Sequence, residues 1–169
     1  MSKKHEWYEA IWDIKCYDGN GRLKWEEIRS NILVDEGERA IVDTFFRNNA
    51  ASYFPATNFY VGLYKGSISE STVLTTIPGE PSGNGYARTV CERSSVGFPT
   101  LEQDGGDWRV VSKEFSLTAS GGSIGPVNGA FLGTSLNDTG SLIGAVAMAI
   151  ERTILSGDTV TFQIRIKIK

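Results

Sequence analysis

Side chains that most often carry catalysis are scarce in this chain of 169 residues. Its one histidine, His5, lies in the polar run Met1–Glu6, and its two cysteines, Cys16 and Cys91, are far apart in the sequence. A Ser/His/Asp or Cys/His nucleophile needs an imidazole that packing holds in place. A zinc site needs a cluster of His and Cys ligands. The sequence therefore predicts that the chain is not an enzyme and that it uses no cofactor and no metal, with Cys91 an inert thiol.

Carboxylates are the remaining residues that could carry chemistry. Glu102, Asp104 and Asp107 fall in a Gly-containing loop, where oxygen ligands could hold a hard cation, although a solvated hairpin has the same composition. The run Asp18-Gly19-Asn20-Gly21 begins like a calcium loop, but arginines replace its later ligands, so a hairpin turn is favoured. An ion at the Glu102 loop stays an open alternative.

Paired carboxylates also suggest glycoside hydrolysis, for which Glu26 with Glu27, or Glu36 with Glu38, are the candidates. This reaction needs two carboxylates that face each other across a cleft. Neighbouring positions of a strand point to opposite faces, so Glu26 and Glu27 alone do not form such a pair. A glycan-active enzyme is therefore the weakest of the functional hypotheses.

Composition narrows the class of protein further. The chain is 40% apolar with a net charge of −3, which predicts a single folded domain over residues 7–169 and a flexible arm over residues 1–6. The sequence shows no basic face, so direct binding of nucleic acid is not expected. The longest apolar run, Leu142–Ile150, is too short for a membrane span, and no signal peptide is visible. With only two cysteines, the chain is expected to be made in a reducing cytoplasm.

Alternating apolar positions predict a mainly β protein. The last strand shows this best, because Val160, Phe162, Ile164 and Ile166 alternate with polar residues. The predicted strands are Tyr8–Cys16, Leu23–Arg29 with a bulge near Glu26–Glu27, Asn58–Tyr64, Ala87–Arg93, Trp108–Thr118, Ile124–Leu132, Leu142–Ile150 and Asp158–Ile168. Turn-forming clusters separate them, Gln103–Asp107 among these. With one helix near the N-terminal third, this pattern is typical of an antiparallel β-sandwich or jelly roll.

The predicted helix spans Asp35–Arg47. Asp35 followed by Glu38 matches a capping box with Asp in the first position. Val34, Ile41, Val42, Phe45 and Phe46 follow helical spacing and so form an apolar face.

The segment Leu142–Ile150 is apolar on both faces, and a strand of this kind is covered on both sides. Its odd positions could be covered by the helix Asp35–Arg47 or by a second subunit, which would make the chain a homo-oligomer, a dimer or a trimer. The loop Lys65–Gly85 is too long for a simple connection and is predicted to be functional or mobile. The proposed interface comprises Ile143, Ala145, Ala147 and Ala149, with Arg165, Lys167 and Lys169 as basic residues that could meet an acidic partner.

Several short motifs occur in a fixed order along residues 23–168. They are Asn31-Ile32-Leu33-Val34-Asp35-Glu36-Gly37, Tyr60-Val61-Gly62-Leu63, Gly85-Tyr86-Ala87-Arg88, Gly129-Ala130-Phe131-Leu132, Leu142-Ile143-Gly144-Ala145 and Gly157-Asp158-Thr159-Val160. In this order they resemble structural proteins of tailed bacteriophages, a resemblance that carries no catalytic residues. It implies a component of the virion that is made in the host cytoplasm.

Within that class the expected function is a capsid cement (decoration) protein that binds the major capsid protein shell and stabilises it. The proposed contacts are the loop Lys65–Gly85, the arm Ser2–Glu6 and the odd face of Leu142–Ile150. The alternative is a tail or baseplate accessory protein with host- or carbohydrate-contacting loops.

Overall fold

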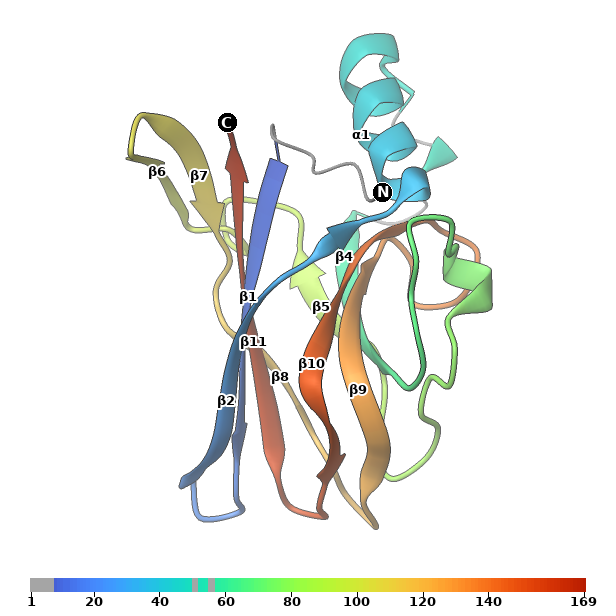
Figure 1. Ribbon diagram of the computed structural model, residues 1–169, viewed down its shortest axis with the longest axis vertical. Coiled ribbons are helices and arrows are strands. Elements are labelled where there is room, and N and C mark those ends of the chain that lie inside the picture. The colour runs from blue at the N-terminus through green and yellow to red at the C-terminus, as the bar shows by residue number, and fades with distance from the viewer. Residues whose placement is uncertain (1–7, 50–51, 55–56) are drawn as a thin grey trace.

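The computed structural model describes residues 8–49, 52–54 and 57–169, so the predicted arm over residues 1–6 lies outside the described part of the chain. Two antiparallel sheets face each other, and the helix α1 (Asp35–Arg47) stands at one end of them (Figure 1). This arrangement confirms the predicted mainly β, sandwich-like fold with a helix in the N-terminal third.

The first sheet is built on the strand pair β1–β11, which runs the full length of both strands. Its strand order is β2-β1-β11-β7-β6, and β8 also pairs with β11. The strands are β1 (Tyr8–Tyr17), β2 (Leu23–Ser30), β6 (Thr100–Asp104), β7 (Asp107–Val111), β8 (Phe115–Thr118) and β11 (Thr159–Ile168).

The second sheet has the order β3-β10-β9-β4-β5. Its strands are β3 (Ile32–Leu33), β4 (Asn58–Tyr64), β5 (Thr89–Glu92), β9 (Ile124–Gly133) and β10 (Leu142–Ile154). A short 3₁₀ helix, η2 (Leu74–Thr76), lies in the connection between β4 and β5.

The main hydrophobic core lies between the two sheets. Trp12 and Ile14 of β1 and Phe162 of β11 are fully buried there, and they pack in one cluster with residues such as Leu63 and Val146 from the second sheet. The alternation predicted for β1 and β11 is therefore confirmed at these core positions.

The predicted bulge in β2 is at a different place. The register shifts where Cys16 pairs with Trp25 and Tyr17 pairs with Leu23, which leaves Lys24 as the extra residue. Near Glu26–Glu27 the register is regular, and the broken hydrophobic pattern has another cause: Glu27 itself faces the interior. Its carboxylate accepts hydrogen bonds from the Ala149 amide (2.7 Å) and from Arg152 (3.0 Å) of β10, so a polar residue occupies a core-facing position.

The predicted strand Trp108–Thr118 is two strands that pair with different halves of β11. β7 pairs with Arg165–Ile168 and β8 pairs with Thr159–Phe162. In addition, β6 was not predicted, because its end was assigned to the turn Gln103–Asp107. The actual turn is the pair Gly105–Gly106, both with positive φ, which closes a tight β6–β7 hairpin.

The helix has the predicted bounds but differs at its start and in its orientation. Its N-cap is Val34, with no side-chain hydrogen bond, so the predicted capping box is absent. The helix lies against β10 so closely that a Cβ on Gly37 would come within 2.1 Å of the Ile143 carbonyl oxygen. Small residues therefore face the sheet, and the predicted apolar face leaves Phe45 and Phe46 exposed.

The outer face of the second sheet is also apolar, and the connection Lys65–Gly85, here the covering segment, packs on it. Leu74 and Ile68 of this segment form a second buried cluster with Tyr64 of β4 and Phe131 of β9. Two glycines leave room for the aromatic rings, because a Cβ on Gly62 would meet the Phe131 ring at 2.3 Å and one on Gly129 would meet Tyr64 at 2.2 Å. The sequence predicted that this loop is functional or mobile. The structure shows instead that it packs on the sheet and covers it.

The odd face of Leu142–Ile150 is not one surface. A register shift between Leu142 and Gly144 turns Ile143 toward the main core, where it is buried. Ala145 is buried with the covering segment, whereas Ala147 and Ala149 are exposed. The predicted shared face is corrected accordingly: the bulge separates its members, and the covering segment shields Ala145 together with Leu142.

Candidate functional site

The carboxylates considered for an ion are held by basic side chains. Arg109 donates to Glu102 and, at 3.0 Å, to Asp104. Lys167 lies 3.6 Å from the Asp104 carboxylate and 3.5 Å from that of Asp107. Within the part of the chain that the structure describes, no group of three His, Cys, Asp or Glu residues is placed to hold a metal ion. The arrangement is an ion-pair network on a solvated hairpin.

The glutamates considered for glycoside hydrolysis have structural partners. Glu27 is bound by Ala149 and Arg152, and Glu26 lies 3.3 Å from Lys15. The Glu36 carboxylate accepts hydrogen bonds from the amides of Leu74 (3.1 Å) and Leu142 (2.6 Å), and so joins α1 to η2 and β10. These bonds occupy Glu27 and Glu36 in holding elements together.

The basic residues predicted to meet an acidic partner already have acidic neighbours on the same sheet. Arg165 donates to Asp13 at 3.5 Å, Lys167 lies beside Asp104 and Asp107, and Lys169 lies 2.8 Å from Glu9. Their charges are therefore largely compensated within the chain.

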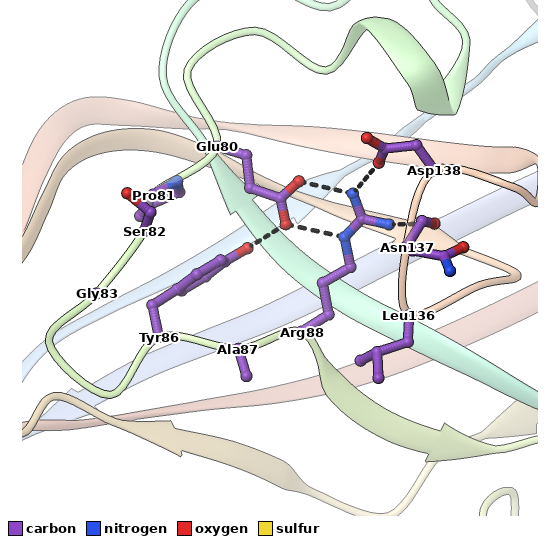
Figure 2. Close-up of a pocket in the computed structure, with 10 residues that line it drawn as sticks. All are labelled: Glu80, Pro81, Ser82, Gly83, Tyr86, Ala87, Arg88, Leu136, Asn137 and Asp138. Atoms are coloured by element: carbon purple, nitrogen blue, oxygen red, sulfur yellow. Dashed lines mark hydrogen bonds and ion pairs between the residues drawn. The ribbon is translucent and has the colours of Figure 1, made fainter.

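The structure contains a polar pocket that the sequence did not single out. This pocket has a volume of about 440 Å³ and lies between the covering segment and the β9–β10 connection (Figure 2). It is lined by Glu80, Pro81, Ser82, Gly83, Tyr86, Ala87, Arg88, Leu136, Asn137 and Asp138. Arg88, whose side chain is only 5% exposed, extends across it.

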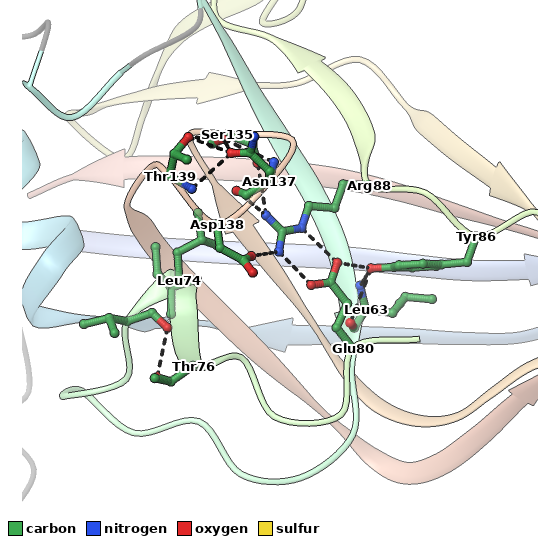
Figure 3. A network of polar contacts seen from close by, with 12 residues as sticks. Leu63, Leu74, Thr76, Glu80, Tyr86, Arg88, Ser135, Asn137, Asp138 and Thr139 are labelled. Carbon is green, nitrogen blue, oxygen red and sulfur yellow. Dashed lines mark hydrogen bonds and ion pairs between the residues drawn. The ribbon is translucent and has the colours of Figure 1, made fainter. Parts of the chain in front are cut away.

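The guanidinium of Arg88 uses all of its hydrogen-bond donors within the protein (Figure 3). Its Nε and Nη2 donate to the two Glu80 carboxylate oxygens at 2.8 and 2.6 Å, and Nη2 also donates to Asp138 at 2.7 Å. Nη1 donates to the carbonyl oxygens of Ser135 (3.2 Å) and Asn137 (2.8 Å). A guanidinium has five N–H donors, so none remains for a ligand.

Tyr86 completes this network. Its hydroxyl donates to Glu80 at 2.8 Å and accepts a hydrogen bond from the Leu63 amide at 3.0 Å. Burial raises the pKa of Tyr86, and the neighbouring Glu80 charge raises it further. Burial alone would lower the pKa of Arg88, but its hydrogen bonds and the charges of Glu80 and Asp138 outweigh burial and raise it. The phenol therefore stays protonated and the guanidinium stays charged.

Because of these bonds, the network acts first as a clamp that ties the covering segment and the β9–β10 connection to the second sheet. The groups left to face solvent are mainly acceptors, above all the Asp138 carboxylate, which is 62% exposed. This chemistry suits recognition of hydroxyl or cationic groups. It provides no nucleophile with an activating base among the residues that line the pocket.

The cysteines are inert in their surroundings. Both are buried and unpaired. Burial raises the pKa of Cys16 to about 11 and that of Cys91 to about 12, so neither forms a thiolate near neutral pH. The structure thus agrees with the prediction that Cys91 is an unreactive thiol.

Apolar side chains are exposed at the end of the molecule where α1 stands. Phe45 and Phe46 of the helix are 79% and 76% exposed, and Leu101 of β6 and Trp108 of β7 are 66% and 56% exposed. Helical spacing predicted the apolar face of α1, but it did not predict that Phe45 and Phe46 on this face are exposed. No α-helix in the described ranges is long and apolar enough to cross a membrane.

Taken together, the described side chains build a β-sandwich whose polar groups mostly serve structure and whose exposed features suit contacts with other molecules. Comparison with known proteins identifies the family of the chain. A family model described as "Podophage GP4 fiber I protein gp80" matches residues 33–166, which is most of the chain. No curated protein shows significant similarity to the chain.

The chain belongs to the Podophage GP4 fiber I protein gp80 family, and it is a structural protein of a bacteriophage virion. The predicted virion class is thereby confirmed. The match is to a fiber family, and it gives no support to the expected capsid cement role.

Proposed function

We propose that this protein is a non-enzymatic component of the phage tail fiber apparatus and acts there through contacts with other molecules. The observation that carries the proposal is the match of residues 33–166 to a fiber family. The paired carboxylates, the saturated Arg88 guanidinium and the buried cysteines support the non-enzymatic part, because these groups are engaged in holding the fold.

The position of the protein in the virion tests this proposal. The chain is expressed in infected cells with a small C-terminal epitope tag, and purified virions are labelled with gold-conjugated antibody. Label at the tail or its fibers is the expected result. Label spread over the head, together with co-sedimentation of the purified protein with expanded empty capsids, would instead establish the capsid cement role and the major capsid protein as partner.

Contact with host carbohydrate belongs to the same proposal and is assigned to the pocket beside Arg88. Its Asp138 carboxylate, which pairs with Arg88 but is 62% exposed, and the neighbouring Ser82 and Asn137 side chains supply polar groups of the kind that bind sugar hydroxyls. The substitution Asp138→Ala should weaken adsorption of the phage to host cells. Glu151→Ala, which removes a half-exposed carboxylate on β10, is the matched control. Equal adsorption by both variants would remove the pocket from the proposal.

A further inference from the structure

One end of the first sheet presents apolar side chains that the second sheet does not cover. Ile168 of β11 lies on the same face as Phe162 and Ile164, which are buried in the core, yet it is 51% exposed. Trp108 pairs with Ile168, and Leu101 pairs with Val110 two residues further along β7, so both share this core-side face. The face therefore continues the core surface beyond the reach of the second sheet.

The opposite face of the same strands is charged. Glu102, Asp104, Arg109 and Lys167 form their ion pairs there, on positions that alternate with the apolar ones. Such an amphipathic sheet is typical of strands with one face in water and the other packed on a partner. Leu101, Trp108 and Ile168 are arranged to be covered, and the described chain leaves all three at least half exposed.

The helix presents a second uncovered apolar surface. Phe45 and Phe46 contact each other edge to face, with ring centroids 5.0 Å apart, and Val42 on the preceding turn is 48% exposed. The side of the helix that faces the protein carries Gly37, Ala40 and Asp43. Val42, Phe45 and Phe46 thus point away from the sandwich, whereas Ile41 packs against the main core.

Both surfaces lie at the same end of the molecule, where α1 and the ends of β6, β7 and β11 rise above the remaining strands (Figure 1). Together, Val42, Phe45, Phe46, Leu101, Trp108 and Ile168 are called the open end. Phe45, Phe46 and Trp108 are aromatic, and such side chains bury about 150–250 Å² each, so with the three smaller aliphatic residues the open end can bury on the order of 700 Å². A stable interface buries about 800 Å² on each partner, which the two surfaces approach only in combination.

We infer that the open end binds a second copy of this chain, with the exposed face of α1 in one copy packed on Leu101, Trp108 and Ile168 of another. A protruding helix face and a flat sheet face on one chain can cover each other between copies, and a two-fold axis brings both contacts into one interface, so that each copy buries both surfaces. This inference goes beyond the tail-fiber proposal and does not depend on it.

Sedimentation velocity of the purified full chain over a range of concentrations is the first test. The wild type should form a discrete dimer. Phe45→Ser with Phe46→Ser, and separately Leu101→Ser with Trp108→Ser, should each raise the dissociation constant at least tenfold, since buried aromatics dominate interface energies. Unchanged circular dichroism spectra will show that the variants fold.

A matched control uses exposed leucines at the other end of the molecule. Leu23→Ser with Leu155→Ser alters two side chains that are 52% and 51% exposed, and Figure 1 places the β1–β2 and β10–β11 turns opposite to α1. This control should leave the association unchanged. A wild type that stays monomeric at all concentrations, or an oligomer that neither open-end variant weakens, would overturn the inference and leave the open end to a different virion protein.

Cysteine trapping distinguishes helix-to-sheet contact from contact between two helices. The native cysteines are buried, so the variants Phe46→Cys and Trp108→Cys each carry one exposed thiol. Mixed and oxidised with a copper–phenanthroline catalyst, they should form a disulfide between the two different variants in preference to either homodimer. Cross-linking of Phe46→Cys only to itself would contradict the helix-to-sheet packing.

Discussion

Two apolar surfaces of this sandwich lie outside the space between its sheets. One is covered by the chain itself, and the other is exposed. The outer face of the second sheet is covered by Lys65–Gly85, whose Leu74 is only 1% exposed. The open end has no such cover, and its Leu101 is 66% exposed. The first surface contributes to the stability of a single copy, whereas the second contributes only when another molecule is present.

The clamp at Arg88 explains how the covering segment is held on the outer face of the second sheet. Burying a guanidinium is costly unless its charge and all its hydrogen bonds are satisfied. Arg88 meets both conditions with partners from the covering segment and from the β9–β10 connection, and its guanidinium also lies 5.1 Å above the Phe131 ring. The clamp and the apolar cluster beneath it hold the same segment in place.

The largest effect is expected from removing this clamp. Arg88→Leu leaves the Glu80 carboxylate partly buried without its positively charged partner, and such losses typically cost about 3–5 kcal/mol in the free energy of unfolding. Urea denaturation of the isolated protein measures it. The control Arg109→Leu removes ion pairs on the charged face of the first sheet, where about 1 kcal/mol or less is expected. Equal costs for the two arginines would contradict the clamp.

The next largest effect is expected when a leucine is replaced by alanine under the covering segment, and it can be compared with the same substitution at the open end. Leu74→Ala creates a cavity under the covering segment and should cost about 2–5 kcal/mol. Leu101→Ala should change the stability of the monomer by less than about 0.5 kcal/mol. Thermal unfolding of both variants at low protein concentration gives the two values. A large loss from Leu101→Ala in a monomer would mean that the open end is covered within one chain.

A smaller, pH-dependent effect is expected at Glu27. Burial would raise the pKa of this carboxyl, but the Ala149 amide and the Arg152 and Arg29 guanidinium groups outweigh burial, and its pKa in the folded protein is below the ordinary value. The ionised form therefore stabilises the fold above the unfolded-state pKa of about 4.3, and that contribution is lost as the pH falls through the lower folded-state pKa.

Glu27→Gln should accordingly cost about 1–3 kcal/mol near pH 7, as expected for hydrogen bonds to a charged group. The difference from the wild type should shrink as denaturation is repeated from pH 5 down to pH 3. A cost that stays constant over this range would show that the charge of Glu27 does not contribute.

The smallest effect is expected on the charged face opposite the open end. Lys167→Ala removes a side chain between Asp104 and Asp107, and surface ion pairs of this type contribute about 0–1 kcal/mol. High salt should reduce the difference further. A loss above about 2 kcal/mol in a denaturation experiment would contradict the view that this face is only solvated.

Local patterns in the sequence predicted much of the fold. The bounds of the helix and of β4 agree with the structure, because helical spacing and a short apolar run both depend on near neighbours. The errors arise where a distant contact decides the outcome. Glu27 faces inward because its partners Ala149 and Arg152 lie on another sheet, and this inward carboxylate was mistaken for a bulge.

The candidate site was less predictable for the same reason. Arg88 acts as a clamp because it binds residues from distant segments, and no spacing rule brings these together. Its partners are Glu80, Ser135, Asn137 and Asp138. The open end depends on the β6–β7 hairpin, and the last two residues of its first strand were assigned to the predicted turn Gln103–Asp107. The Gly105–Gly106 pair between two segments with alternating charge was the signal that could have revealed it.

Side-chain footprinting with hydroxyl radicals tests the contrast between the two surfaces most directly. In one experiment on the wild-type protein, oxidation of Leu74 is compared with that of Phe45, Phe46 and Trp108 at low and high concentration. We expect Leu74 to be protected at both, and the three aromatic residues to be oxidised in the dilute protein and protected in the concentrated one. Equal oxidation of the aromatic residues at both concentrations would contradict an open end that a second copy covers.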